Sequence, residues 1–322
     1  MLNTFLYQRG KPLEVNVSRA AMLSALADKD SVLWVDLKNP NDFEADCLVE
    51  IFNFHDMAVE DCINPHSQPK VDDYGEYLFL VMHGVSLQDK KELATLEINI
   101  FIGKNFVVTY HKDLIPAVEN MLDLVKKNPE TFIVRGPDML TYHLLDELVD
   151  NYQPILDQYE EKIDALEEEI FNHPSQDFLA TIMQVKRDVF HFRRIIAPQR
   201  DALNHLTRNP TALIKSKHLI YFRDVYDRLF RLYGTVEGFH DALSGILQAY
   251  FSYSSNKLNE IMKRMTVLAT LTMPTVIIAS IYGMNFKNMP ELGHPYGYFM
   301  SLGLMVVTSM VMLVWMKFKK WI

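Results

Sequence analysis

The chain has 322 residues, 49% of them hydrophobic and 23% charged, which excludes a disordered polypeptide. Its two cysteines, Cys47 and Cys62, are too few for a zinc cluster or a disulfide framework, and they favour a reducing compartment. With 32 basic and 41 acidic residues the protein is acidic, which argues against nucleic-acid partners and is compatible with cations as ligands.

The first 130 residues predict an α/β domain. Runs rich in β-branched and aromatic residues predict strands, and two segments with helical periodicity predict helices. We expect strands at 32–37, 77–87, 96–102 and 106–110, and helices at 42–52 and 114–126. The tripeptide Gly103-Lys104-Asn105 predicts a hairpin between the last two strands. Because no phosphate-binding glycine loop, nucleophile elbow or His/Cys metal spacing is present, we do not expect an enzyme.

Residues 131–264 predict a helical stalk. We expect a first helix over 138–171, kinked at Pro154, because apolar residues recur there every three or four positions. A short turn at Asn172-His173-Pro174 should lead into an antiparallel helix over about 176–206.

A third helix is expected to begin near residue 217 and to continue to about residue 282, since nothing between Tyr253 and Met265 breaks it. Its apolar residues alternate spacings of three and four, which predicts a heptad seam. The seam consists of Phe222, Val225, Leu229, Leu232, Val236, Phe239, Leu243, Ile246, Tyr250 and Tyr253. Gly234, Gly238 and Gly245 weaken this helix locally, so we expect neighbouring helices to pack closely there.

Residues 265–322 predict a transmembrane domain, because the segments 265–286 and 292–316 contain no charged residue. Each has the roughly 20 residues with which a helix crosses about 30 Å of hydrocarbon. We expect a first span at 265–284, an outer loop at 285–295, a second span at 296–316 and a basic tail. Basic residues flank both spans, so the positive-inside rule predicts that both termini are cytoplasmic. These basic residues are Lys257, Lys263, Arg264, Lys317, Lys319 and Lys320.

The first span ends with Gly283-Met284-Asn285, and the loop continues with Met289-Pro290-Glu291-Leu292. These motifs, in this position, closely resemble the CorA family of magnesium and cobalt channels. The resemblance covers the whole chain and includes the stalk segment from Tyr221 to Asp227 and the pair Glu60-Asp61.

The resemblance implies a fold and a function. The fold is an α+β cytosolic domain, arranged as an α/β sandwich, with a long helical stalk and two C-terminal transmembrane helices. Five copies are expected to form a funnel-shaped homopentamer around one pore in a prokaryotic inner membrane. The implied function is Mg²⁺ influx, with passage of Co²⁺ or Ni²⁺ as well, and the implied partners are further copies of the chain, these ions and membrane lipid.

The resemblance also implies a selectivity filter at Gly283, Met284 and Asn285. Mg²⁺ dehydrates reluctantly, so a site for it at a pore mouth should contact the waters of the hydrated ion, which the Asn285 amide and backbone carbonyls can do. Glu291 is expected to attract cations to the outer loop. By the same resemblance, the residues that line the pore and its gate are Asn259, Met262, Met265, Ala269 and Met273.

Regulatory Mg²⁺ is expected between the cytosolic domains of neighbouring subunits. The residues that match the family are Glu60, Asp61, Asp146 and Asp224, of which Asp61 and Asp224 are the favoured pair. Carboxylates from two subunits repel each other unless a cation bridges them, so intracellular Mg²⁺ would hold the channel closed.

Two other interpretations remain open at this point. A ZntB-like Zn²⁺ transporter shares Gly-Met-Asn but usually lacks Met-Pro-Glu-Leu, so residues 289–292 favour the magnesium branch. A membrane-anchored coiled-coil scaffold would use the spans only as anchors, and the motif at Asn285 would then be accidental.

Overall fold

The structure, a computed structural model, describes residues 1–64, 68–88, 92–171, 174–175, 177–209, 211–319 and 321. The chain divides into two compact units, residues 1–246 and 247–322, and helix α10 (Leu219–Tyr282) contributes residues to both. The predicted combination of an α/β domain, a long helix and two C-terminal apolar helices is confirmed.

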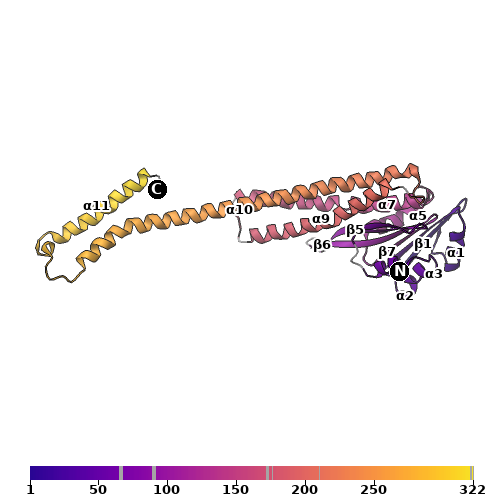
Figure 1. Cartoon of the computed structure of the whole chain (residues 1–322), viewed down its shortest axis with the longest axis horizontal. Helices are drawn as coiled ribbons and strands as arrows, with labels where there is room; N and C mark the ends of the chain where they lie inside the picture. The colour runs from indigo at the N-terminus through magenta and orange to yellow at the C-terminus, as the bar shows by residue number, and fades with distance from the viewer. Residues whose placement is uncertain are drawn as a thin grey trace. The chain divides into compact units, whose positions relative to one another are not determined.

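The first unit is built on one seven-stranded mixed sheet (Figure 1). The strand order is β2-β1-β3-β7-β6-β5-β4, in which only the β3–β7 pair is parallel among the described strands. The strands are β1 (Leu2–Gln8), β2 (Glu14–Val15), β3 (Ser31–Lys38), β4 (Lys70–Asp73), β5 (Leu78–Gln88), β6 (Glu92–Ile102) and β7 (Phe106–His111).

The four predicted strands are confirmed as β3, β5, β6 and β7, and the predicted hairpin joins the last two. Ile102 pairs with Val107 across that hairpin, and the Gly103 N–H donates to the Phe106 carbonyl at 2.9 Å. Strands β1, β2 and β4 were not predicted. They add to the sheet on both sides of the predicted strands, so the sheet is wider than the sequence pattern indicates.

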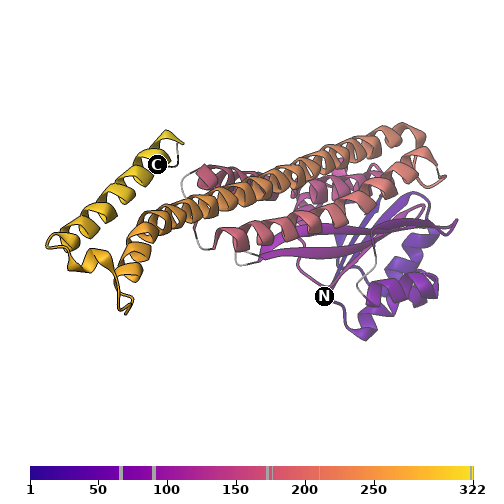
Figure 2. The same ribbon diagram turned by 60° about the vertical axis from the view of Figure 1, so that its left-hand side comes forward.

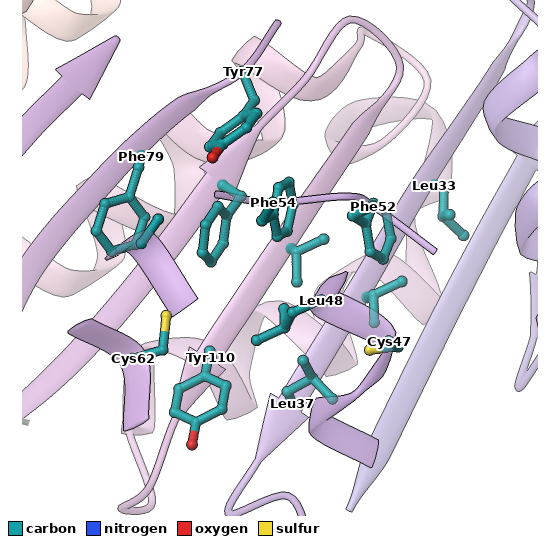
Figure 3. Packing of buried hydrophobic residues seen from close by; sticks show 14 of the residues in the cluster. Leu33, Leu37, Cys47, Leu48, Phe52, Phe54, Cys62, Tyr77, Phe79 and Tyr110 are labelled. Carbon is teal, nitrogen blue, oxygen red and sulfur yellow. The ribbon is translucent and has the colours of Figure 1, made fainter. Parts of the chain in front are cut away.

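One face of the sheet is covered by four short helices and holds an aromatic core (Figure 3). Phe54 is 3% exposed, and its ring stacks on Phe101 at 4.0 Å and lies 4.7 Å from the ring of Tyr77. Both cysteines are buried on this face, and burial raises the pKa of the Cys47 thiol to about 11. The helices are α1 (Arg19–Ala27), α2 (Asp42–Ala45), α3 (Cys47–Glu50) and α4 (Asp56–Ile63).

The prediction of one helix over 42–52 is wrong, because α2 and α3 are separate short helices. The α2 helix begins with a capping box between Asn41 and Glu44. Arg19 donates a hydrogen bond to the Phe43 carbonyl, the group that the N–H of Cys47 would bond in a continuous helix. The side chain of Arg19 therefore accounts for the break after Ala45.

The opposite face of the sheet is covered by α5 (Pro116–Lys127), α6 (Pro129–Phe132) and α7 (Pro137–Asp150). Figure 2 shows the sheet between this helical layer and the four short helices. Because both faces are covered, β3 is buried at every position except Lys38. Its apolar run from Val32 to Val35 is followed by buried Asp36, which accepts a hydrogen bond from the Thr109 hydroxyl at 2.7 Å.

The predicted helix over 138–171 is also two helices. The helix is interrupted at Asn151 and Tyr152, which form a turn between α7 and α8 (Gln153–Phe171). Pro154 does not kink a helix interior, because it lies in the first turn of α8, where a missing N–H costs nothing. The break places the Tyr152 hydroxyl where it donates to the His83 carbonyl at 2.7 Å and accepts from Gln199 at 2.8 Å.

Helix α9 (Phe178–Arg208) runs antiparallel to α8, as predicted. The antiparallel direction follows from the contacts, because Tyr152 meets Gln199 and Tyr159 meets Phe192 further along α8. Within the predicted turn, Asn172 and His173 lie outside the described residues.

The heptad seam is confirmed in the first unit. Each of its residues from Phe222 to Ile246 is buried, whereas Tyr250 and Tyr253 are partly exposed. A 3₁₀ turn, η1 (Ser216–His218), precedes α10, and buried Asp138 of α7 accepts a hydrogen bond from the Lys215 N–H and contacts the His218 ring at 2.7 Å. The beginning of α10 is thereby fixed to the N-terminal end of α7.

In the second unit, the end of α10 and α11 (Gly297–Phe318) are long and apolar enough to cross a membrane. The Thr275 and Ser309 hydroxyls are 3.3 Å apart, and the Ser309 hydroxyl also donates to the Leu271 carbonyl at 3.3 Å. These contacts join the two helices by polar groups on otherwise apolar surfaces, a common device between membrane helices.

The aromatic core provides a test of the fold. Replacing Phe54 by Ala removes a buried ring that contacts several others, so we expect the free energy of unfolding to fall by about 3–5 kcal/mol. Urea unfolding of the full chain in detergent, followed by tryptophan fluorescence, measures the change. Phe43→Ala is the matched control, because Phe43 is 68% exposed and its removal should have little effect. Equal destabilisation by both substitutions would contradict the packing described here.

Candidate functional site

The predicted filter motif lies where α10 ends. The Gly283 N–H donates to the Ala279 carbonyl at 2.9 Å, and the Met284 N–H donates to the Ile281 carbonyl at 3.3 Å. A Cβ atom on Gly283 would lie 3.1 Å from the Ala279 carbonyl oxygen, a contact closer than side chains normally make. Glycine therefore allows the tight turn that carries the chain from the helix into the motif.

Asn285 follows this turn in irregular backbone and is exposed. Its side-chain amide makes no hydrogen bond to the described residues, so it does not cap the carbonyls at the end of α10. An amide without such hydrogen bonds keeps both its carbonyl oxygen and its N–H groups available for water or for a hydrated ion.

The outer loop contains a 3₁₀ turn, η2 (Pro290–Gly293), before α11 begins. The backbone of Glu291 belongs to this turn, but its side chain lies outside the described part of the structure. The prediction that Glu291 attracts cations therefore stays a prediction.

The five predicted pore residues are all exposed, and Met262, Met265 and Met273 each leave more than 60% of their surface uncovered. At 3.6 residues per turn, this row lies on the side of α10 opposite to Leu271 and Thr275, which contact α11. Neighbouring α11 therefore leaves the row free. The complete row is Asn259, Met262, Met265, Ala269 and Met273.

Of the predicted regulatory carboxylates, Glu60 and Asp61 lie on α4. Glu60 is exposed, whereas Asp61 accepts a hydrogen bond from the Lys70 ammonium at 2.7 Å. Lys70 also contacts Asp72 at 2.7 Å. Burial acts to lower the pKa of Lys70, but the hydrogen bonds to the two carboxylates outweigh it and raise the pKa, so Lys70 stays charged.

The other two carboxylates, Asp146 of α7 and Asp224 of α10, meet at Arg228. Its guanidinium donates to Asp146 and Asp150, and to Asp224 at 3.1 Å. Burial acts to lower the pKa of Arg228, but the hydrogen bond to Asp224 and the negative charges outweigh it and raise the pKa. Burial raises the pKa of Asp146, the positive charge of Arg228 opposes that shift, and Asp150 adds to it.

The structure thus brings Asp146 and Asp224 together, but around a side chain of the same protein rather than in a bare carboxylate site. No group of three or more His, Cys, Asp or Glu residues suited to a metal ion occurs among the described residues. The sequence pattern did not predict the roles of Arg228, Asp150 and Lys70. Arg228 was detectable in principle, because it stands four residues after Asp224 on a helix, the spacing of an ion pair.

The fold and the site together define a protein with an α/β unit, two helices long and apolar enough to cross a membrane, and a polar motif at the end of one of them. Comparison with known proteins narrows this class. A family model described as "CorA-like Mg2+ transporter protein" matches residues 29–320. The cobalt/magnesium transport protein CorA of Thermotoga maritima is 37% identical over 275 residues, which cover 85% of this chain and 78% of that protein. The chain therefore belongs to the CorA-like Mg²⁺ transporter family.

Solved structures agree in fold. The complete structure of the CorA magnesium transporter from Methanocaldococcus jannaschii has a TM-score of 0.86 and 22% sequence identity, and the match covers 100% of this chain and 99% of that one. The cytoplasmic domain of ZntB from Vibrio parahaemolyticus is a more distant neighbour, with a TM-score of 0.63, 12% identity and coverage of 79% of this chain and 98% of that one. These solved structures share the fold of this chain, and the ZntB match covers the cytoplasmic domain alone.

The contact between the two membrane helices can be tested separately from transport. Ser309→Ala removes the only hydroxyl of α11 that the described residues show bonded to α10, and we expect a loss of about 0.5–2 kcal/mol. Steric-trap unfolding of the full chain in detergent bicelles measures this loss. Ser301→Ala is the control, because among the described residues the Ser301 hydroxyl donates only to the Tyr298 carbonyl of its own helix. A loss no larger than that of the control would count against the contact.

Proposed function

We propose that the chain is a divalent-cation channel that admits hydrated Mg²⁺ and Co²⁺, and also Ni²⁺, past a ring of Asn285 side chains. The observation that carries this proposal is the exposed Asn285 amide at the end of the helix, which makes no hydrogen bond to the described residues. A neutral amide can bind the water shell of Mg²⁺ without removing it, which suits an ion that dehydrates reluctantly. Gly283 and Met284 position this ring.

The channel is proposed to be a homopentamer in the inner membrane of a prokaryote, with both termini in the cytoplasm. One chain contributes two apolar helices, which cannot enclose a pore. The uncovered row on α10, from Asn259 to Met273, would line the pore in such an assembly, and its methionines would form an apolar constriction that stops a hydrated ion. The close packing expected at Gly234, Gly238 and Gly245 is not found within the chain, because a Cβ atom at each would meet nothing within 4 Å. In the proposed assembly, another copy of the chain would pack there.

Regulation by intracellular Mg²⁺ is proposed to act through the carboxylates Asp61, Asp224, Glu60 and Asp146 between neighbouring subunits. Two of these carboxylates already bind Arg228, and a third binds Lys70. A divalent ion must therefore compete with a cation that the protein itself supplies. This competition lowers the affinity of the site, which suits a sensor of an ion that is abundant inside cells.

Neither alternative interpretation has comparable support. A Zn²⁺ transporter of the ZntB type has the weaker structural similarity. A scaffold anchored by its spans would not need an unbonded amide at the end of α10, and it gives no reason for the family match over residues 29–320.

Asn285→Ala tests the proposed filter. We expect initial Mg²⁺ entry into proteoliposomes to fall at least about tenfold, because each subunit loses one or more hydrogen bonds to the hydrated ion, each worth about 1 kcal/mol. An internal Mg²⁺ dye under an applied membrane potential measures entry. Asn288→Ala makes the same change three residues further along the exposed loop and should leave entry nearly unchanged. Equal activity of Asn285→Ala and wild type would overturn the filter, and Zn²⁺ entry driven by a proton gradient would favour the zinc branch.

Arg228→Gln tests the proposed regulatory site. Removing the tethered cation leaves Asp146 and Asp224 available, so we expect the Mg²⁺ concentration that half-protects the full-length protein from proteolysis to fall about five- to tenfold. Arg231→Gln is the control, because Arg231 is an exposed arginine on the same helix outside this cluster. An unchanged or higher half-protecting concentration in Arg228→Gln would mean that these carboxylates do not bind the regulatory ion.

A further inference from the structure

A hollow of about 230 Å³ opens beside the aromatic core, on the face of the sheet that the four short helices cover. Its lining comes from the ends of α1 and α3, from the turn between β4 and β5 and from the turn between β6 and β7, all within the first compact unit. Phe52 and Tyr77 belong both to this lining and to the aromatic core (Figure 3). Neither the proposed pore row nor the proposed regulatory carboxylates contribute to the hollow.

The aromatic wall of the hollow is fixed by the packing around it. The ring of Phe106 folds back over Gly103, where a Cβ atom would clash with it. The centre of this ring lies 5.1 Å from that of Phe52, which is itself 9% exposed. A ligand that enters the hollow therefore meets an apolar surface that is already in place, and little of the protein has to become ordered on binding.

The amide of Asn105 joins the β6–β7 turn to the end of α1. Its Nδ2 donates to the carbonyls of Ala25 and Asp28 at 3.0 and 2.9 Å, so these hydrogen bonds determine which way the amide is oriented. They also hold Leu26, another lining residue, against the turn. The Oδ1 of Asn105 accepts no hydrogen bond from the described residues and is left as an acceptor for a ligand.

Two opposite charges border the hollow, Glu76 and Lys104. The last cross-strand pair of β5 and β6 at this end is Leu78 and Ile102, so the two charged residues occupy matching positions, each two residues beyond that pair. Both side chains are exposed, and neither forms an ion pair or a hydrogen bond with the described residues. Each charge is therefore available to a ligand, and neither neutralises the other.

We propose that this hollow binds a free α-amino acid with an apolar side chain. The carboxylate of the amino acid pairs with Lys104, and its ammonium group pairs with Glu76 and donates to the Asn105 Oδ1. Its side chain lies against Phe52 and Phe106. A simple anion or cation would use only one of the two charges and would leave the apolar wall in water. The volume is below the range of about 300–1,000 Å³ that is usual for drug-sized ligands, which suits a molecule as small as one amino acid.

Fluorine NMR of 4-fluoro-L-phenylalanine measures this binding without any transport assay, so the result does not depend on the proposed channel function. The full chain in phosphatidylcholine nanodiscs is added to the ligand, and protein-free nanodiscs correct for partition into lipid. We expect saturable broadening of the fluorine signal that unlabelled L-phenylalanine reverses. Phenethylamine lacks the carboxylate and 3-phenylpropionate lacks the ammonium group. Each should compete at least about tenfold more weakly, because it loses one charge-assisted contact.

Variants of the lining then locate the ligand. Glu76→Gln and Lys104→Gln should each raise the Kd about tenfold, and both changes are on exposed side chains that the fold does not need. Leu26→Trp fills the hollow and should abolish binding although both charges remain. Lys29→Gln and Asp30→Asn are the matched controls, because these exposed charges follow α1 without lining the hollow, and both should bind as wild type does.

Three results would overturn the proposal. Broadening no greater than in protein-free nanodiscs at millimolar amino acid would show that the hollow does not bind this class of ligand. An unchanged Kd in both Glu76→Gln and Lys104→Gln would show that the amino acid is bound elsewhere. Competition by 3-phenylpropionate or phenethylamine as strong as that by L-phenylalanine would show that the hollow selects an anion or an amine rather than the two charges of an amino acid.

Discussion

The structure depends on the continuity of one helix in two different solvents. The backbone hydrogen bonds of α10 continue over 64 residues, although its surroundings change completely along the way. Up to Ile246 the seam is buried against the helices of the first unit, whereas beyond Leu247 the same helix exposes large apolar side chains. A helix satisfies its own backbone hydrogen-bonding groups in water and in hydrocarbon alike, whereas a strand or an open sheet leaves some of them unpaired. Only its side chains have to change between the two environments.

Charge determines how the first unit holds this helix. Arg228 joins three carboxylates from α7 and α10, and Asp138 fixes the beginning of α10. Asp146 is half-buried, whereas Asp150 and Asp224 are exposed, and without a counter-charge the three carboxylates would repel one another. The guanidinium therefore does in the single chain what a bridging Mg²⁺ is proposed to do between chains. In the proposed channel, this tethered cation would balance the carboxylates when Mg²⁺ is scarce, and Mg²⁺ would compete with it when Mg²⁺ is abundant.

The sequence predicted those elements whose signals are local. The apolar spans, the heptad seam and the Gly103 hairpin follow from periodicity and composition, and all three are confirmed. The helix break after Ala45 depends on Arg19, which is distant in sequence, so no local pattern indicated it. Strand β4 is half-buried and reads Lys-Val-Asp-Asp, which no alternation rule recognises as a strand, yet it pairs with β5. The proposed filter residues were named by resemblance, and the pattern alone did not show that Asn285 makes no side-chain hydrogen bond to the described residues.

The spans contain no acidic residue, which explains why a neutral amide, and not a carboxylate, is suited to contact the ion. A carboxylate ring in hydrocarbon would bind Mg²⁺ too firmly to release it and would be costly to bury before the ion arrives. A neutral amide at the end of the helix avoids both costs, because it exchanges hydrogen bonds with the waters of the ion and not with the ion itself. In the proposed channel, selection would depend on the size and the geometry of a hydrated ion, so residues that fix the turn, such as Gly283, would matter as much as Asn285 itself.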